Sequence, residues 1–249
     1  MPRIRLLVAL CAVAALATAP FAHGATSSVV ISQIYAGGGN AGATYANDFV
    51  ELFNRGTAAV DVSGWTVQYA SAASTSWQTT ALAGSIGPGR YYLVQLASTA
   101  QVGSPLPAAD ATGTTNLANA GGKVALVRGT AALTCGSSAG SCAAAPLVDD
   151  LVGYGSATDY EGAGPAPALD STTAAVRSSG GCGDTNANAT DFTGAAPVPR
   201  NAGTPAAPCA GGSTPSLSTK NSVSSYSRGA KLSVYRARRT SPSSRATSA

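Results

Sequence analysis

The sequence has 249 residues, of which 10% are charged and 45% hydrophobic, with 29 Gly and 14 Pro and a formal net charge of +4. Soluble domains typically carry about 25% charged residues, and long helices need abundant Glu, Lys, Leu and Arg. The composition therefore excludes a coiled coil or a helical bundle, and the glycines lack the three-residue period of collagen. The length allows one large β domain or two small ones.

Residues 1–24 have the pattern of a secretory signal peptide. Arg3 and Arg5 precede an apolar run over residues 6–17, and small residues surround a cleavage position after Gly24. The apolar run is shorter than the ~20 residues that a membrane-spanning helix needs, so we expect cleavage rather than a membrane anchor. The mature protein is then secreted, either extracellular or periplasmic, with no stable membrane span.

The signal peptide removes His23, which is the only histidine. A Ser-His-Asp triad, a Cys-His pair and a histidine-ligated zinc site are therefore excluded. Four cysteines remain, and an oxidising compartment favours two disulfides in one of three pairings. We favour Cys135–Cys142, which closes a short Gly/Ser loop, and Cys182–Cys209, which fixes the end of the domain. A Cys₄ zinc site is disfavoured because the spacing lacks a C-x₂-C pair.

Charge divides the mature chain into two parts. Residues 25–209 contain all 11 acidic residues and only six basic ones, whereas residues 210–249 contain seven basic residues, twelve serines and no acidic residue. The second part has too few apolar residues to offset the entropy of ordering it. We therefore expect one folded domain over 25–209 and a disordered basic tail over 210–249. A frameshift from a longer gene is an alternative origin of the tail.

Seven short runs in the folded part are typical of β-strands. They are residues 29–35, 49–53, 65–69, 91–96, 123–127, 147–152 and 173–177. No window has a useful helical period, so the pattern predicts an all-β sandwich or barrel with long loops. We expect Phe49, Val50, Glu51 and Leu52 to belong to the structural core, with Glu51 partly buried and hydrogen-bonded. Trp65 is predicted to pack between two sheets.

One run of oxygen-bearing side chains is the candidate metal site. It consists of Asp184, Asn186, Asn188 and Asp191. Their spacing resembles the first half of a calcium loop, but Ala189 and Ala195 stand where such a loop has Gly and Glu. Asx turns explain the same residues without a metal. We therefore expect no cofactor, with calcium as the one candidate.

Two groups of acidic residues and one tryptophan are further candidate sites. Asp48 and Glu51 lie three positions apart on one strand, so they point to opposite faces and do not form a catalytic pair. The densest acidic patch, formed by Asp149, Asp150, Asp159 and Glu161, has enough oxygen ligands for calcium, but a solvated loop is the favoured interpretation. Trp77 lies in a polar run and is the candidate exposed ligand contact.

Several sequence blocks together resemble the bacterial, secreted form of the lamin tail domain. They are residues 31–40 (ISQIYAGGGN), 47–56 (NDFVELFNRG), 60–65 (VDVSGW), 87–94 (GPGRYYLV), 121–127, 149–155 and 184–201. The resemblance implies an immunoglobulin-like β-sandwich of the lamin tail type and implies no catalytic residues. Such domains often precede the catalytic part of secreted nucleases and phosphatases of the endonuclease/exonuclease/phosphatase class.

From these observations we expect an exported module that is not an enzyme and is monomeric. It would serve in binding, targeting or structure at the cell surface or in the medium, and polysaccharide, another protein and DNA remain open as ligands. The acidic folded part argues against DNA unless the basic tail or bound cations assist. The alternative is the N-terminal module of a truncated or frameshifted larger secreted nuclease or phosphatase.

Overall fold

The computed structural model describes residues 27–209, and strands make up nearly all of its regular structure. The predicted signal peptide (1–24) and basic tail (210–249) lie outside the described residues. The strands are β1 (Val29–Tyr35), β2 (Phe49–Asn54), β3 (Val60–Asp61), β4 (Thr66–Ser71), β5 (Gln78–Ala81), β6 (Ser85–Ile86), β7 (Tyr91–Gln95), β8 (Ala111–Thr112), β9 (Gly121–Val127), β10 (Val148–Gly155), β11 (Ala174–Arg177) and β12 (Phe192–Ala195). A 3₁₀ turn, η1 (Ser178–Gly181), and a single helical turn, α1 (Asn188–Asp191), complete them.

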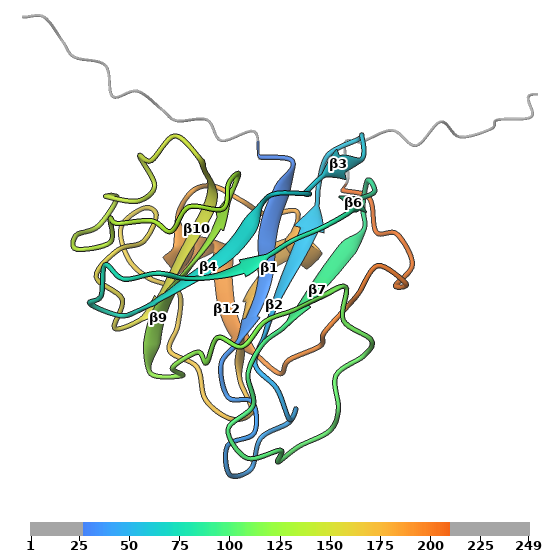
Figure 1. The fold of residues 1–249 in the computed structure, drawn as a ribbon, viewed down its shortest axis with the longest axis vertical. Coiled ribbons are helices and arrows are strands. Elements are labelled where there is room, and N and C mark those ends of the chain that lie inside the picture. The colour runs from blue at the N-terminus through green and yellow to red at the C-terminus, as the bar shows by residue number, and fades with distance from the viewer. Residues whose placement is uncertain (1–26, 210–249) are drawn as a thin grey trace, which may run out of the picture. The chain divides into compact units, whose positions relative to one another are not determined.

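The strands form a two-layered sandwich (Figure 1). One sheet has the order β12-β11-β1-β2-β7-β8, the other has the order β10-β9-β4-β5, and β3 pairs with β6 in a small ribbon. The pairings are antiparallel except for β7 with β8. This arrangement confirms the predicted all-β, immunoglobulin-like sandwich, and the seven predicted runs correspond to β1, β2, β4, β7, β9, β10 and β11.

The main core lies between the two sheets. Val50 and Leu52 of β2 meet Val124 and Leu126 of β9 there, all fully buried. Trp65 packs against this core, as predicted, but it is only partly buried and directly precedes β4. The guanidinium of Arg128 lies 5.1 Å from its ring centroid.

A bulge in β1 changes which side chains face the core. The register with β2 shifts between Ile31 and Gln33, so Ile31 and Ile34 both point into the core although they are three residues apart. Val30 and Tyr35 face the other side of the sheet. Bulges place two residues opposite one and break the two-residue alternation of a strand.

Both outer faces of the sandwich are covered by loops that carry disulfides. The loop with Cys135–Cys142 packs over Ala125 and Leu151 of the four-stranded sheet. Cys182–Cys209 lies over the outer face of the six-stranded sheet, against Phe53. This is the pairing that the sequence favours.

Candidate functional site

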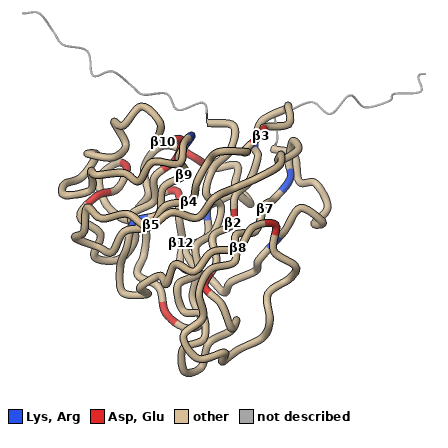
Figure 2. The backbone as a smooth tube through the Cα atoms, in the orientation of Figure 1, with Lys and Arg blue, Asp and Glu red and all other residues tan. Residues whose placement is uncertain are grey.

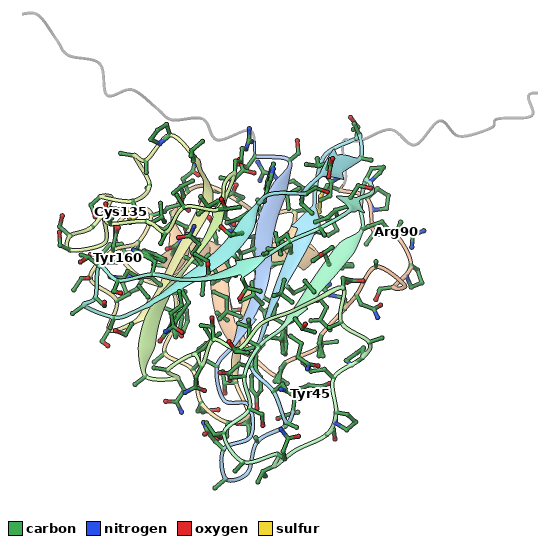
Figure 3. The ribbon with its side chains drawn as sticks, viewed as in Figure 1. Tyr45, Arg90, Cys135 and Tyr160 are labelled. Carbon is green, nitrogen blue, oxygen red and sulfur yellow. A yellow bond between two sulfur atoms is a disulfide. The ribbon has the colours of Figure 1, made fainter. Side chains whose placement is uncertain are left out.

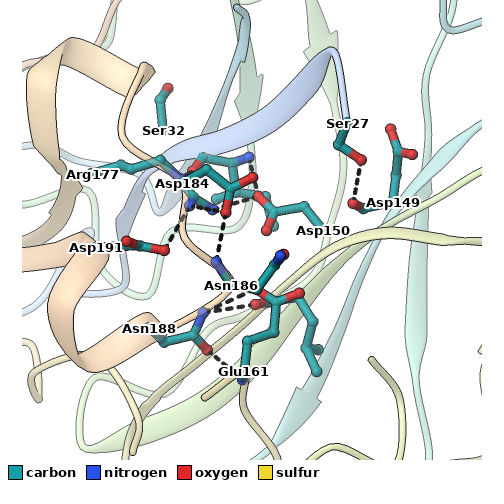
Figure 4. Close-up of polar contacts among 12 residues, drawn as sticks. Ser27, Ser32, Asp149, Asp150, Glu161, Arg177, Asp184, Asn186, Asn188 and Asp191 are labelled. Atoms are coloured by element: carbon teal, nitrogen blue, oxygen red, sulfur yellow. Dashed lines mark hydrogen bonds and ion pairs between the residues drawn. The ribbon is translucent and has the colours of Figure 1, made fainter. Parts of the chain in front are cut away.

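A buried ion cluster lies where β11 ends, in a domain with few charged residues (Figure 2). The guanidinium of Arg177 is fully buried and lies 2.6 Å from Asp150, 3.0 Å from Asp184 and 3.5 Å from Asp191 (Figure 4). Arg55 approaches the other oxygen of Asp184 at 3.2 Å. Buried charges are tolerated when they are paired and hydrogen-bonded, and this cluster meets both conditions.

The cluster also satisfies backbone groups of β1 that lie beyond the end of β11. β11 pairs with β1 only at Gln33 and Ile34, so the backbone of Ile31 lies beyond the end of β11. Asp150 accepts a hydrogen bond from Ile31 N–H at 2.6 Å, and Arg177 Nε donates to the Ile31 carbonyl at 2.7 Å. Buried backbone groups must be hydrogen-bonded. Asp150 and Arg177 therefore supply the two hydrogen bonds that a neighbouring strand would otherwise make to Ile31.

Asn188 joins the cluster to the next acidic side chain. Its side-chain oxygen accepts hydrogen bonds from Gly153 N and Glu161 N, and its amide donates to the Leu151 carbonyl and, at 3.4 Å, to the Glu161 carboxyl. Burial raises the pKa of Glu161 to about 9, and the nearby carboxylate of Asp150 adds to the shift. Glu161 is therefore protonated at neutral pH.

The structure organises the predicted calcium residues differently from a calcium loop. Asp184 and Asp191 face Arg177, and Asn188 is occupied with the backbone of β10 and of Glu161. One oxygen each from Asp150, Glu161 and Asp184 lie within 4.8 Å of one another, so these three are the residues that offer oxygen ligands to a cation. Arg177 already places positive charge against two of them, so the geometry explains the cluster without a metal.

The acidic patch predicted as a solvated loop is instead largely buried, which corrects that interpretation. Asp150 belongs to the ion cluster, and Asp159 is fully buried and accepts a hydrogen bond from Cys142 N at 2.8 Å. Only 5% of the Asp149 side chain is exposed, and it pairs with Arg128. Asp149 and Asp150 lie at the start of β10, and Asp159 lies against the disulfide loop. Each of the three therefore faces a specific partner.

A pocket of about 780 Å³ opens beside the cluster. Its lining comes from the segment 139–146, from Arg128 and Asp149, and from Tyr160 and Glu161. Tyr160 lies on the same side of the domain as Cys135 in Figure 3. Glu161 belongs both to the pocket lining and to the group of carboxyls near Arg177, so it lies between the buried ion cluster and the pocket.

Asp48 and Glu51 are both structural. Asp48 accepts hydrogen bonds from the backbone N–H groups of Gly38 and Leu117, each at 2.8 Å, and burial raises its pKa to about 6. Glu51 is fully buried and is held by Arg200 through both side-chain and backbone nitrogens. As expected, Phe49, Val50 and Leu52 are buried beside Glu51.

The prediction that Trp77 is an exposed ligand contact was wrong. Its side chain is 6% exposed and belongs to the small core under the disulfide loop, with Ala125 and Leu151. The indole N–H donates to the Cys135 carbonyl at 2.9 Å. The polar residues around Trp77 suggested exposure, but a loop 58 residues further along the chain covers it.

Sequence reasoning missed Arg177, which is the centre of the cluster. It was included in a predicted strand, and its basic side chain in an apolar run, AAVR, was the available signal. It also missed the pairing of Arg200 with Glu51, although both residues lie within the blocks that resemble the lamin tail domain. In each case the partners are distant in sequence.

Fold and site together define a two-sheet, disulfide-bearing β-sandwich whose acidic groups are mainly structural. The family comparison agrees with this class: residues 22–139 match the Lamin Tail Domain, so the chain contains a lamin tail domain. No curated protein and no solved structure matches the chain. Over residues 27–209, no helix is long and apolar enough to cross a membrane.

Proposed function

We propose that the protein is an exported, non-catalytic lamin tail domain module that acts by binding a partner at the cell surface or in the medium. The disulfides Cys135–Cys142 and Cys182–Cys209 support the export step, because disulfides persist in oxidising compartments. The match to the lamin tail domain supports a module whose fold alone does not dictate a chemistry.

The observation that carries the non-catalytic part is the state of the carboxylates. Asp48 is bound by two backbone N–H groups, Glu51 by Arg200, and Asp150 by Arg177. General acid–base catalysis needs a carboxyl within reach of a substrate proton, and these three are buried. Glycoside hydrolysis uses a pair of carboxyl groups. Within the described residues, the pocket is lined by Asp149, which is paired with Arg128, and by Glu161, which has no ion pair.

Expression of the full chain with its own N-terminus tests both parts. We expect the protein in the periplasm or medium, with no free thiol by Ellman titration of the denatured, unreduced sample. The purified protein should hydrolyse neither duplex DNA, an aryl phosphate nor a neutral polysaccharide, with or without Ca²⁺ and Mg²⁺. Turnover that co-purifies with the protein and is lost in Glu161→Ala would refute the non-catalytic proposal.

A further inference from the structure

The pocket beside the Arg177 cluster has the size of a ligand site. Its volume of about 780 Å³ falls within the roughly 300–1,000 Å³ that is usual for small-molecule sites. The alanines of residues 143–145 give part of it a smooth apolar surface. The disulfide Cys135–Cys142, and the hydrogen bond that Cys142 N–H donates to the Asp159 carboxylate, hold this segment in place. The pocket is therefore preformed, which lowers the entropic cost of binding.

Two adjacent side chains at the pocket have polar groups to offer a ligand. Tyr160 is partly exposed, and its hydroxyl makes no hydrogen bond within the described part of the chain. Among residues 27–209, the hydrogen bond to the Glu161 carboxyl is the long one from Asn188, at 3.4 Å. An aromatic ring with a free hydroxyl, next to a carboxyl group, combines an apolar platform with hydrogen-bonding capacity.

The charges at the pocket favour a ligand without net charge. Arg128 is already paired with Asp149, so an anionic ligand would have to compete with that carboxylate for the guanidinium. A nucleic acid needs several free cationic groups, and among the lining residues Arg128 is the only basic one. Asp149 adds no acceptor for a ligand, because one of its oxygens faces Arg128 and the other is buried.

We propose that this pocket binds a neutral sugar unit, with the Tyr160 ring against the apolar face of the sugar and Glu161 hydrogen-bonded to its hydroxyls. Carbohydrate fits this site because a pyranose ring has an apolar C–H face and a rim of hydroxyls that both donate and accept. The assignment rests on the proposed binding function and names the ligand class for it.

Affinity electrophoresis of the full secreted protein tests the assignment. The gels contain soluble β-glucan, xylan or galactomannan as neutral polymers, and polygalacturonate or duplex DNA as charged comparisons. We expect retardation by at least one neutral polymer. A tetrasaccharide from that polymer then gives a Kd by calorimetry.

Four variants separate a role in binding from a role in folding. Tyr160→Ala and Glu161→Ala should each weaken binding about tenfold, which corresponds to one lost stacking or hydrogen-bonding contact. Tyr160→Phe and Glu161→Gln should stay within about threefold, because the ring remains in the first and the amide still donates and accepts in the second. Tyr45→Ala, a partly buried tyrosine elsewhere in the domain (Figure 3), is the matched control and should bind like the wild type.

Neutral-polymer binding that weakens about tenfold in both alanine variants, while each variant remains folded at the assay temperature, supports the assignment. Neutral-polymer binding that both variants retain overturns the pocket as its site, although the protein remains a binding module. Retardation by polygalacturonate or DNA alone, or by none of the polymers, overturns the sugar assignment. Hydrolysis of a polymer would instead refute the non-catalytic function, so the two failures are distinguishable.

Discussion

Replacing Arg177 by methionine removes the guanidinium that faces Asp150, Asp184 and Asp191, while it keeps much of the side-chain volume beside Phe192. Breaking a buried ion pair by removing one partner costs about 3–5 kcal/mol, because the other charge is left uncompensated. The lost hydrogen bond to the Ile31 carbonyl adds about 1 kcal/mol. Protonation of one carboxyl relieves part of this cost, so we expect a total loss of about 4 kcal/mol in the free energy of unfolding.

Urea unfolding at neutral pH measures the loss, and the melting temperature should fall by roughly 8–16 °C for a domain of this size. Burial raises the pKa of Asp150 and the charge of Arg177 lowers it, so without Arg177 this pKa rises further in the folded state and protonation stabilises the variant. Its deficit relative to the wild type should therefore shrink as the pH falls from neutral towards about 4. Arg177→Lys keeps the charge but loses the planar fork and should lie between the two. A loss in Arg177→Met below about 1 kcal/mol, or one that does not depend on pH, would refute the structural role of the cluster.

Three further predictions concern the loops and the cluster. Trp77→Ala should cost about 3–5 kcal/mol in urea unfolding by opening a cavity under the disulfide loop, and a neutral result would contradict its burial. The double change Cys182→Ser and Cys209→Ser should lower the free energy of unfolding by about 2–4 kcal/mol. A reducing agent should then destabilise the double variant less than the wild type, because only Cys135–Cys142 is left to reduce. The raised pKa of Glu161 means that the folded state binds its proton more tightly than the unfolded state. Wild-type stability should therefore decrease as the pH rises from about 5 to 9, and Glu161→Gln should flatten this decrease; an identical pH profile would contradict the pKa shift.

The longer strands and their layering could be predicted because hydrophobic runs and turns mark them locally. The polar strand β5 has the sequence QTTA, and β8 spans only two residues, so neither has an apolar pattern to find. The bulge in β1 could not be predicted either. It puts Ile31 and Ile34 on one face, whereas the two-residue alternation of a regular strand would put them on opposite faces.

The candidate site was harder to predict than the fold because its contacts join distant residues. Arg177 and Asp150 are 27 positions apart, and Asp150 and Ile31 are 119 apart. The acidic residues were visible in the sequence, but their partner was not, so the same carboxylates suggested a metal or a solvated loop. The prediction for Trp77 was wrong for the same reason, since its indole N–H bonds to Cys135, 58 positions further along the chain.

The segment beyond the family match is integral to the sandwich. The match ends at residue 139, yet β10 pairs with β9 along its length and β11 pairs with β1 in the other sheet. Without these strands, β9 and β1 would each expose an unpaired edge, and exposed edges invite association with other chains. The same segment supplies Arg177 and most of the pocket lining. The pocket is therefore built largely from residues outside the matched region, and its ligand preference does not follow from the lamin tail match alone.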